Sequence, residues 1–203
     1  MKQQLAFVGD IHGNVRALRT IWRELGRLNL DRVVFLGDYI NKGYESSEVM
    51  STLLEIESEG RATLLRGNHE TAFLSAVEDN VMGPFLKMGG ALTIRSYVGG
   101  AVKPSVWEEL RNAVPAPHVE LVRRMPQEFT SNEVQARHEP WDRTVGTYAI
   151  SAHIYIGREP KIGSGSAQID TGCGDSGGRL TALLWPSLKF IQADEHGNLI
   201  PTS

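Results

Sequence analysis

The sequence predicts an α/β fold in which two β-sheets pack together. Short apolar runs at residues 5–8, 33–36 and 62–65 each end in a polar loop and precede an amphipathic helical pattern. This repeated strand and helix order is typical of parallel strands joined by right-handed crossovers. From residue 148 onward, short strand-like runs alternate with turns that contain Gly or Pro, and they predict a second sheet.

Length and composition restrict the classes of protein that remain. The 203 residues fit a single domain, residues 1–203, and 41% hydrophobic with 22% charged residues is ordinary for a globular fold. No apolar run approaches the roughly 18 residues of a membrane span, and the N-terminal segment is not a signal peptide, so we expect a cytoplasmic protein without a membrane partner. A net charge of −3 with interspersed signs argues against a nucleic-acid partner. The single cysteine, Cys173, is expected to be a small packing residue.

The first half reads as three strand and helix pairs. The first helix shows its apolar face most clearly, since Val15, Leu18, Ile21 and Leu25 recur at three- and four-residue steps. In order, the predicted elements are a strand at 5–8, a helix at 15–28, a strand at 33–36, a helix at 49–56, a strand at 62–65 and a helix from residue 73.

The second half has a different pattern. Residues 83–131 contain two Gly-Gly pairs and five prolines, which predict helices and connecting loops with the clearest helix at 119–125. Strands are predicted at 149–156, 167–169, 180–184 and 189–193. Ahead of the run at 149–156, no further strand is expected after Met125.

Polar residues follow each of the first three strands. Because the carboxyl ends of parallel strands share one edge of the sheet, Asp10, His12, Asp38, Asn68 and His69 should converge. A single polar strand end would be weak evidence, since Asp and Asn also cap helices. Three such ends, each preceded by a glycine, favour a site. Oxygen and nitrogen donors without a thiolate suit manganese, iron, zinc or magnesium.

These segments resemble the signature blocks of the calcineurin-like metallophosphoesterases. The blocks are Gly9-Asp10-Ile11-His12-Gly13, Gly37-Asp38-Tyr39-Ile40-Asn41-Lys42-Gly43 and Gly67-Asn68-His69-Glu70. The third block resembles the phosphoprotein phosphatase branch, the Ser/Thr protein phosphatase type, and the likeness continues at 89–97 and 169–183. The resemblance implies two packed mixed β-sheets flanked by helices, a four-layer α+β architecture.

The resemblance also implies a metal-dependent phosphomonoesterase in which hydroxide, activated by two divalent ions, attacks phosphorus directly. Asp10 and His12 would hold the first ion, Asp38 would bridge both ions, and Asn68 would hold the second and face the phosphate. His69 would be the general acid. The expected metal is manganese, with iron, zinc or magnesium as alternatives, and the expected substrate is a phosphoprotein, an aryl phosphate or a nucleotide.

Three more residues are assigned by comparison with the family pattern. His153 lies where the family has a ligand histidine, although its neighbours differ, and a histidine bonded within the core is the alternative. Arg143, in a segment that resembles a family Trp-x-Arg motif, would grip phosphoryl oxygens, with a surface arginine as the alternative. His138 lies in a polar loop and is interpreted as solvated and outside the site, with substitution for a missing ligand of the second ion as the alternative.

The second block departs from the family pattern. Where the family usually has Asp-Arg, this chain has Asn41-Lys42. Neutral Asn41 can orient His69 but cannot stabilise its charge, and Lys42 keeps a positive charge without a two-pronged grip on phosphate. We therefore expect an enzyme that prefers good leaving groups. A weakly held second ion is also expected, because no strand carrying another ligand is found.

Two other functions remain open at this point. One is hydrolysis of diadenosine polyphosphates or other nucleotides, for which related families use the same core blocks. The other is a non-catalytic phosphate- or phosphoprotein-binding module, which the departures at Asn41 and Lys42 favour. The intact Asp38 and His69 argue against the binding module.

Overall fold

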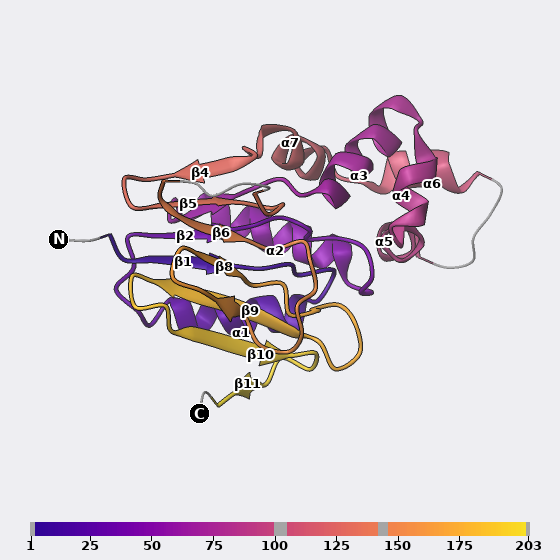
Figure 1. Ribbon diagram of the computed structural model, residues 1–203. Helices are drawn as coiled ribbons and strands as arrows, with labels where there is room; N and C mark the ends of the chain where they lie inside the picture. The colour runs from indigo at the N-terminus through magenta and orange to yellow at the C-terminus, as the bar shows by residue number, and fades with distance from the viewer. Residues whose placement is uncertain (1–2, 100–104, 142–145, 202–203) are drawn as a thin grey trace.

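The computed structural model of the protein describes residues 3–99, 105–141 and 146–201 (Figure 1). A six-stranded sheet has the order β11-β10-β9-β1-β2-β3. The first three strands in the chain are parallel, and the last three pair antiparallel. Their bounds are β1 (Leu5–Val8), β2 (Arg32–Phe35), β3 (Ala62–Leu64), β9 (Arg179–Trp185), β10 (Phe190–Asp194) and β11 (Leu199–Ile200). The three predicted strand and helix pairs are confirmed.

A second, five-stranded mixed sheet has the order β4-β5-β6-β8-β7. Its strands are β4 (Glu128–Thr130), β5 (Val134–Arg137), β6 (Tyr148–Ser151), β7 (Lys161–Ile162) and β8 (Ser166–Gln168). The expectation that no strand lies between Met125 and His153 is wrong, because β4 and β5 fall there. The strand predicted at 149–156 ends at Ser151, so His153 lies in the loop beyond it.

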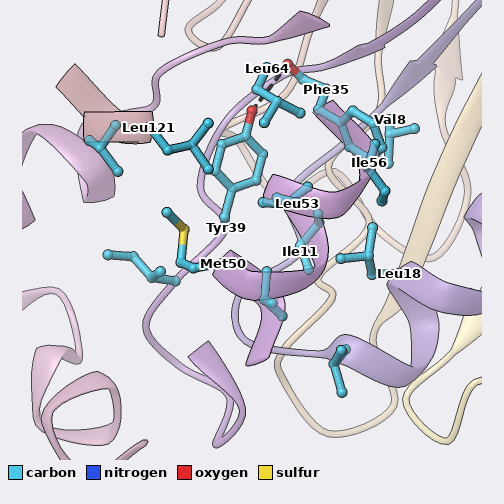
Figure 2. Close-up of a cluster of buried hydrophobic side chains, with 14 of the residues drawn as sticks. Val8, Ile11, Leu18, Phe35, Tyr39, Met50, Leu53, Ile56, Leu64 and Leu121 are labelled. Atoms are coloured by element: carbon cyan, nitrogen blue, oxygen red, sulfur yellow. Dashed lines mark hydrogen bonds between the residues drawn. The ribbon is translucent and has the colours of Figure 1, made fainter. Parts of the chain in front are cut away.

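Helices α1 (Val15–Leu25) and α2 (Ser46–Ser58) pack on one face of the six-stranded sheet. The side chain of Asn14 caps α1 by accepting a hydrogen bond from the N–H of Ala17 at 2.9 Å. Figure 2 shows the apolar layer beneath these helices, where Leu18 of α1 and Leu53 of α2 lie close to Phe35 of β2. Burial of this layer supplies the main stabilisation of the first half.

The remaining helices gather beyond one end of the sheets (Figure 1). They are α3 (Asn68–Asp79), α4 (Met82–Lys87), α5 (Gly90–Val98), α6 (Val106–Ala113) and α7 (Ala116–Arg124). This agrees with the helices and loops predicted for 83–131. In the described ranges, none of the helices combines the length and apolar character needed to cross a bilayer.

The two faces of β1 explain its uninterrupted apolar sequence. Leu5 and Phe7 pack between the two sheets, whereas Ala6 and Val8 face the helical layer. A strand buried on both faces needs apolar residues at every position. The second sheet contributes Ile150 and other residues to the layer between the sheets. This packing holds the carboxyl ends of β1, β2 and β3 at a common edge.

Candidate metal centre

The polar residues that follow β1, β2 and β3 lie together at this edge. Asp38 Oδ2 is 4.0 Å from Nε2 of His12 and 3.6 Å from Nε2 of His69. Oδ2 of Asp10 is 3.6 Å from the same His12 nitrogen. All four side chains are buried, so their polar atoms depend on one another or on a ligand for stabilisation.

The second sheet brings His138 and His153 to the same edge. Nε2 of His138 lies 3.2 Å from Oδ2 of Asp38 and 3.0 Å from Nδ1 of His153. Oδ1 of Asn68 lies 2.9 Å from Nε2 of His138 and 3.1 Å from Nδ1 of His153. The structure therefore gathers Asp10, His12, Asp38, Asn68 and His69, as the strand order predicted, together with His153, which the resemblance suggested, and adds His138.

The interpretation of His138 as a solvated residue outside the site is wrong. His138 is only 4% exposed and directly follows β5, which pairs parallel with β6. The signal in the sequence was weak, because β5 has only four residues with alternating burial, and Val134 and Ala136 are its two buried positions. A polar residue close behind a strand is nevertheless the feature that marks Asp10 after β1.

Two groups of potential ligands share one carboxylate. His12, Asp38 and His69 form the first group, and Asp38, His138 and His153 form the second; within each group one donor atom per residue lies within 4.8 Å of the others. Asp38 is positioned by its own backbone turn at φ 54° and accepts a 3.1 Å hydrogen bond from the N–H of His69. A shared carboxylate between two donor groups is the arrangement that a two-ion centre requires.

Backbone carbonyls set the protonation of two imidazoles. Nδ1 of His12 lies 3.0 Å from the carbonyl oxygen of Ile40, and Nδ1 of His138 lies 3.1 Å from that of Leu36. A carbonyl oxygen can only accept, so each Nδ1 carries a hydrogen. In each neutral ring Nε2 then presents a lone pair to the centre, as metal-binding histidines do.

Two further observations show that the donor set fits cations. Oδ2 of Asp10 is buried without a hydrogen-bond partner among the described residues. The amide of Asn68 also lies against Nε2 of His138 and Nδ1 of His153, where its oxygen could serve as a ligand beside the two imidazoles. The residues present therefore suit divalent ions with oxygen and nitrogen ligands.

Burial and charge shift the acidities within this cluster. Burial opposes ionisation of Asp38, but the hydrogen bond and charge of His138 hold the pKa of this carboxyl well below its usual range. Burial likewise disfavours the charged form of His138, and Asp38 overrides it and raises the pKa of His138 to about 9. Burial dominates at His69 and lowers its pKa to about 4.

The residues predicted to bind phosphate or to take part in proton transfer differ in their surroundings. Nδ2 of Asn41 lies 2.8 Å from Nδ1 of His69. Nζ of Lys42 lies 3.9 Å from Oδ2 of Asp175, and both side chains are at least partly exposed. Nδ2 of Asn68 points toward Sδ of Met88 at 3.9 Å. Arg143 lies outside the described residues.

A cavity of about 510 Å³ adjoins the centre, and Arg66, Asn68 and His138 contribute to its lining. A larger cavity of about 850 Å³ lies over the second sheet between Trp141 and Ser164, and none of the predicted site residues that the structure describes lines it. The smaller cavity is therefore the one placed to receive a substrate of this centre.

Comparisons with known proteins agree with the geometry. Residues 4–161 match the family model of the calcineurin-like phosphoesterases. The chain is 38% identical over 85 residues to the serine/threonine-protein phosphatase 6 catalytic subunit of Drosophila melanogaster, which is 41% of this chain and 28% of that protein. It is 39% identical over 71 residues to the serine/threonine-protein phosphatase 4 catalytic subunit of Saccharomyces cerevisiae, which is 34% of this chain and 23% of that protein. The matched segments thus span less than a third of the length of these relatives.

Solved structures show the same fold at low identity. A structure described as a putative diadenosine tetraphosphatase has a TM-score of 0.64 and 19% identity, covering 95% of this chain and 93% of the other. A cold-active protein-tyrosine phosphatase of a psychrophilic Shewanella species has a TM-score of 0.62 and 12% identity, covering 98% and 80%. These likenesses establish the arrangement of the two sheets and the flanking helices.

Proposed function

The chain belongs to the calcineurin-like phosphoesterase family, and from this premise we propose that it is a metal-dependent phosphomonoesterase of the Ser/Thr protein phosphatase type. The observation that carries the proposal is the gathering of carboxylate, amide and imidazole donors around Asp38. The similarity to Ser/Thr phosphatase catalytic subunits supports the choice of substrate class.

The proposed ligands form two sets that share Asp38. Asp10, His12 and Asp38 would hold one divalent ion, and Asp38, Asn68, His138 and His153 would hold the other; we propose manganese for both. Such ions lower the pKa of bound water and neutralise phosphoryl oxygens. The expectation of a weakly held second ion is withdrawn, because its premise was the missing strand that β5 provides.

The remaining residues act on the substrate. Once its ring is protonated on both nitrogens, His69 would give the proton on Nε2 to the departing oxygen and return to the neutral form, while Asn41 contacts the ring at Nδ1. Lys42 would place positive charge beside the phosphoryl group. Nδ2 of Asn68, which faces Met88, would donate to a phosphoryl oxygen. Arg143 is proposed for the same task on the sequence resemblance alone.

A substrate panel tests the proposal. The full chain is assayed with manganese and with chelator on an aryl phosphate, a phosphoserine peptide and diadenosine tetraphosphate. Chelator-sensitive hydrolysis of the first two supports a phosphomonoesterase. Hydrolysis of diadenosine tetraphosphate alone would establish the nucleotide hydrolase instead. Silence on all three substrates while manganese is bound would favour a phosphate-binding module.

A further inference from the structure

A buried series of hydrogen bonds connects α5 to His69. Oγ1 of Thr93, on α5, lies 2.7 Å from Oδ1 of Asn41. Nδ2 of Asn41, on the other side of the same amide, lies 2.8 Å from Nδ1 of His69. Thr93 and Asn41 are fully buried, and His69 is nearly so, so water does not compete for these groups.

The hydrogens in this series can be counted. The backbone N–H of Asn41 donates to Oγ1 of Thr93 at 2.9 Å, and Oγ of Ser46 lies 2.9 Å from the same Thr93 oxygen. If the Ser46 hydroxyl donates to Thr93 and the Thr93 hydroxyl donates to Oδ1 of Asn41, every hydroxyl hydrogen has an acceptor. The amide then presents its N–H group to His69.

The opposite orientation of the Asn41 amide leaves one hydroxyl hydrogen without an acceptor. If Nδ2 of Asn41 faced Thr93, the Thr93 hydroxyl would have to donate to Ser46. The Ser46 hydroxyl hydrogen would then lack an acceptor among the hydrogen bonds of the described residues, and Ser46 is completely buried. An unsatisfied buried donor costs about 1–3 kcal/mol, so the first arrangement is favoured.

The direction of this series distinguishes His69 from its neighbours. Because Asn41 donates to Nδ1 of His69, the ring hydrogen must lie on Nε2, which faces Oδ2 of Asp38 at 3.6 Å. His12 and His138 have the reverse arrangement, since backbone carbonyls hold the hydrogen on Nδ1. In their neutral forms two imidazoles thus present lone pairs to the cluster, and the third presents an N–H group.

We propose that Thr93 is a positioning residue that fixes the Asn41 amide, so that the neutral His69 ring keeps its one hydrogen on Nε2 and is a hydrogen-bond donor, not a third ligand, in the His12 and Asp38 group. The exclusion of His69 as a ligand rests on the proposed metal-dependent function, whereas the position of the hydrogen does not. Rotation of Asn41 would move the ring hydrogen to Nδ1 and expose a lone pair on Nε2. His69 would then complete the donor group that it already adjoins.

The test uses nitrogen NMR of the full, metal-free chain labelled with ¹⁵N-histidine, and His69→Gln assigns the His69 signals. In the unmodified protein, Nε2 of His69 is expected to be protonated and Nδ1 unprotonated. Thr93→Val removes the hydroxyl and should transfer a measurable fraction of the hydrogen to Nδ1, and Thr93→Ser should restore the original pattern.

Ser96→Ala is the matched control. Ser96 also joins α5 to α2, through a 2.8 Å contact of its Oγ with Oγ of Ser47, but it does not touch Asn41. The His69 signals of the Ser96→Ala variant should match those of the unmodified protein. A hydrogen on Nδ1 in the unmodified protein, or an unchanged pattern in folded Thr93→Val, would overturn the proposal.

If Thr93→Val does not fold, a second variant, Asn41→Asp, tests the proposed hydrogen-bond arrangement. In Asn41→Asp the carboxylate can only accept, so His69 must carry a hydrogen on Nδ1. Identical His69 signals in this variant and in the unmodified protein would refute the proposed arrangement. If the unmodified protein shows the expected nitrogen shifts but hydrolyses none of the substrates, the result counts against the phosphatase function and leaves the hydrogen-bond series intact.

Discussion

Asn41 and Lys42 stand where carboxylate and guanidinium groups would be expected, and their effect on substrate choice can be measured. Burial keeps the pKa of His69 at about 4, and neutral Asn41 does not oppose this. His69 is therefore a weak source of protons for a poor leaving group. Converting Asn41→Asp together with Lys42→Arg should raise the kcat for alkyl phosphates by roughly tenfold, with a smaller gain for aryl phosphates. An alkyl rate that stays level or falls would contradict this explanation.

His138 supplies a nitrogen that no other residue near it replaces. Its ring is held by the Leu36 carbonyl and contacts both Asp38 and His153. His138→Ala should therefore lower the number of tightly bound manganese ions from two to one, with at least a tenfold loss of affinity at the second site, as measured by calorimetry. His196→Ala is the control, because the side chain of His196 is 69% exposed and belongs to neither donor group. If His138→Ala still binds two manganese ions with unchanged affinity, His138 is excluded as a ligand.

The pH dependence of metal binding follows from the same residue. In the metal-free protein the pKa of His138 is about 9, so the ring is protonated near neutral pH. A cation must displace this hydrogen, so binding should release protons and tighten as the pH rises toward 9, then level off. Calorimetry in buffers of different ionisation enthalpy measures the release. An absence of proton release near pH 7 would contradict the raised pKa.

Most of the centre could be predicted, for an identifiable reason. Asp10, Asp38 and Asn68 follow strands that are recognisable from apolar runs, and parallel strand ends must meet. His138 was missed because its strand is short and half-buried, which leaves no apolar run. Thr93 lies 52 residues from Asn41 on a helix packed by tertiary contacts, and no local pattern indicates that pairing.

At the scale of elements, Glu70 joins the start of α3 to the loop after β2. Its carboxylate accepts hydrogen bonds from the N–H groups of Asp38 and Tyr39 at 2.8 Å and of Gly67 at 3.1 Å. Glu70→Ala would leave these buried donors unsatisfied, so the free energy of unfolding in urea should fall by ~3 kcal/mol or more. Glu78→Gln, on the exposed side of the same helix, is the control and should change it by about 0.5 kcal/mol or less. Equal effects would refute this role of Glu70.

The loops around the centre hold unusual backbone conformations. Seven non-glycine residues in the described ranges have positive φ, and five of them are candidate site residues: His12, Asp38, Asn41, Lys42 and His153. Such conformations cost of order 1–3 kcal/mol each and persist when surrounding contacts impose them. Strand and helix patterns do not encode them, so the sequence predicted which residues converge but not how each side chain is aimed.

At the scale of the whole molecule, Cys173 reports on global unfolding. The thiol is 1% exposed, contacts the carbonyl oxygen of Ile11, and has a pKa raised by burial. Iodoacetamide should therefore modify the native protein very slowly, and the rate should follow the unfolded fraction across a urea titration. Manganese should slow it further if the ions bind only the folded chain. Rapid stoichiometric labelling of the native protein, measured by mass spectrometry, would show that this region opens locally.

The order β11-β10-β9-β1-β2-β3 has a consequence for biosynthesis. β1 carries Asp10 and His12 at its end, and one of its two neighbours is β9, whose residues leave the ribosome more than 170 positions later. Until Arg179–Trp185 emerge, β1 has an unpaired edge and the loop bearing two ligands lacks its final support. The nascent chain should therefore acquire its ions only after β9 has emerged.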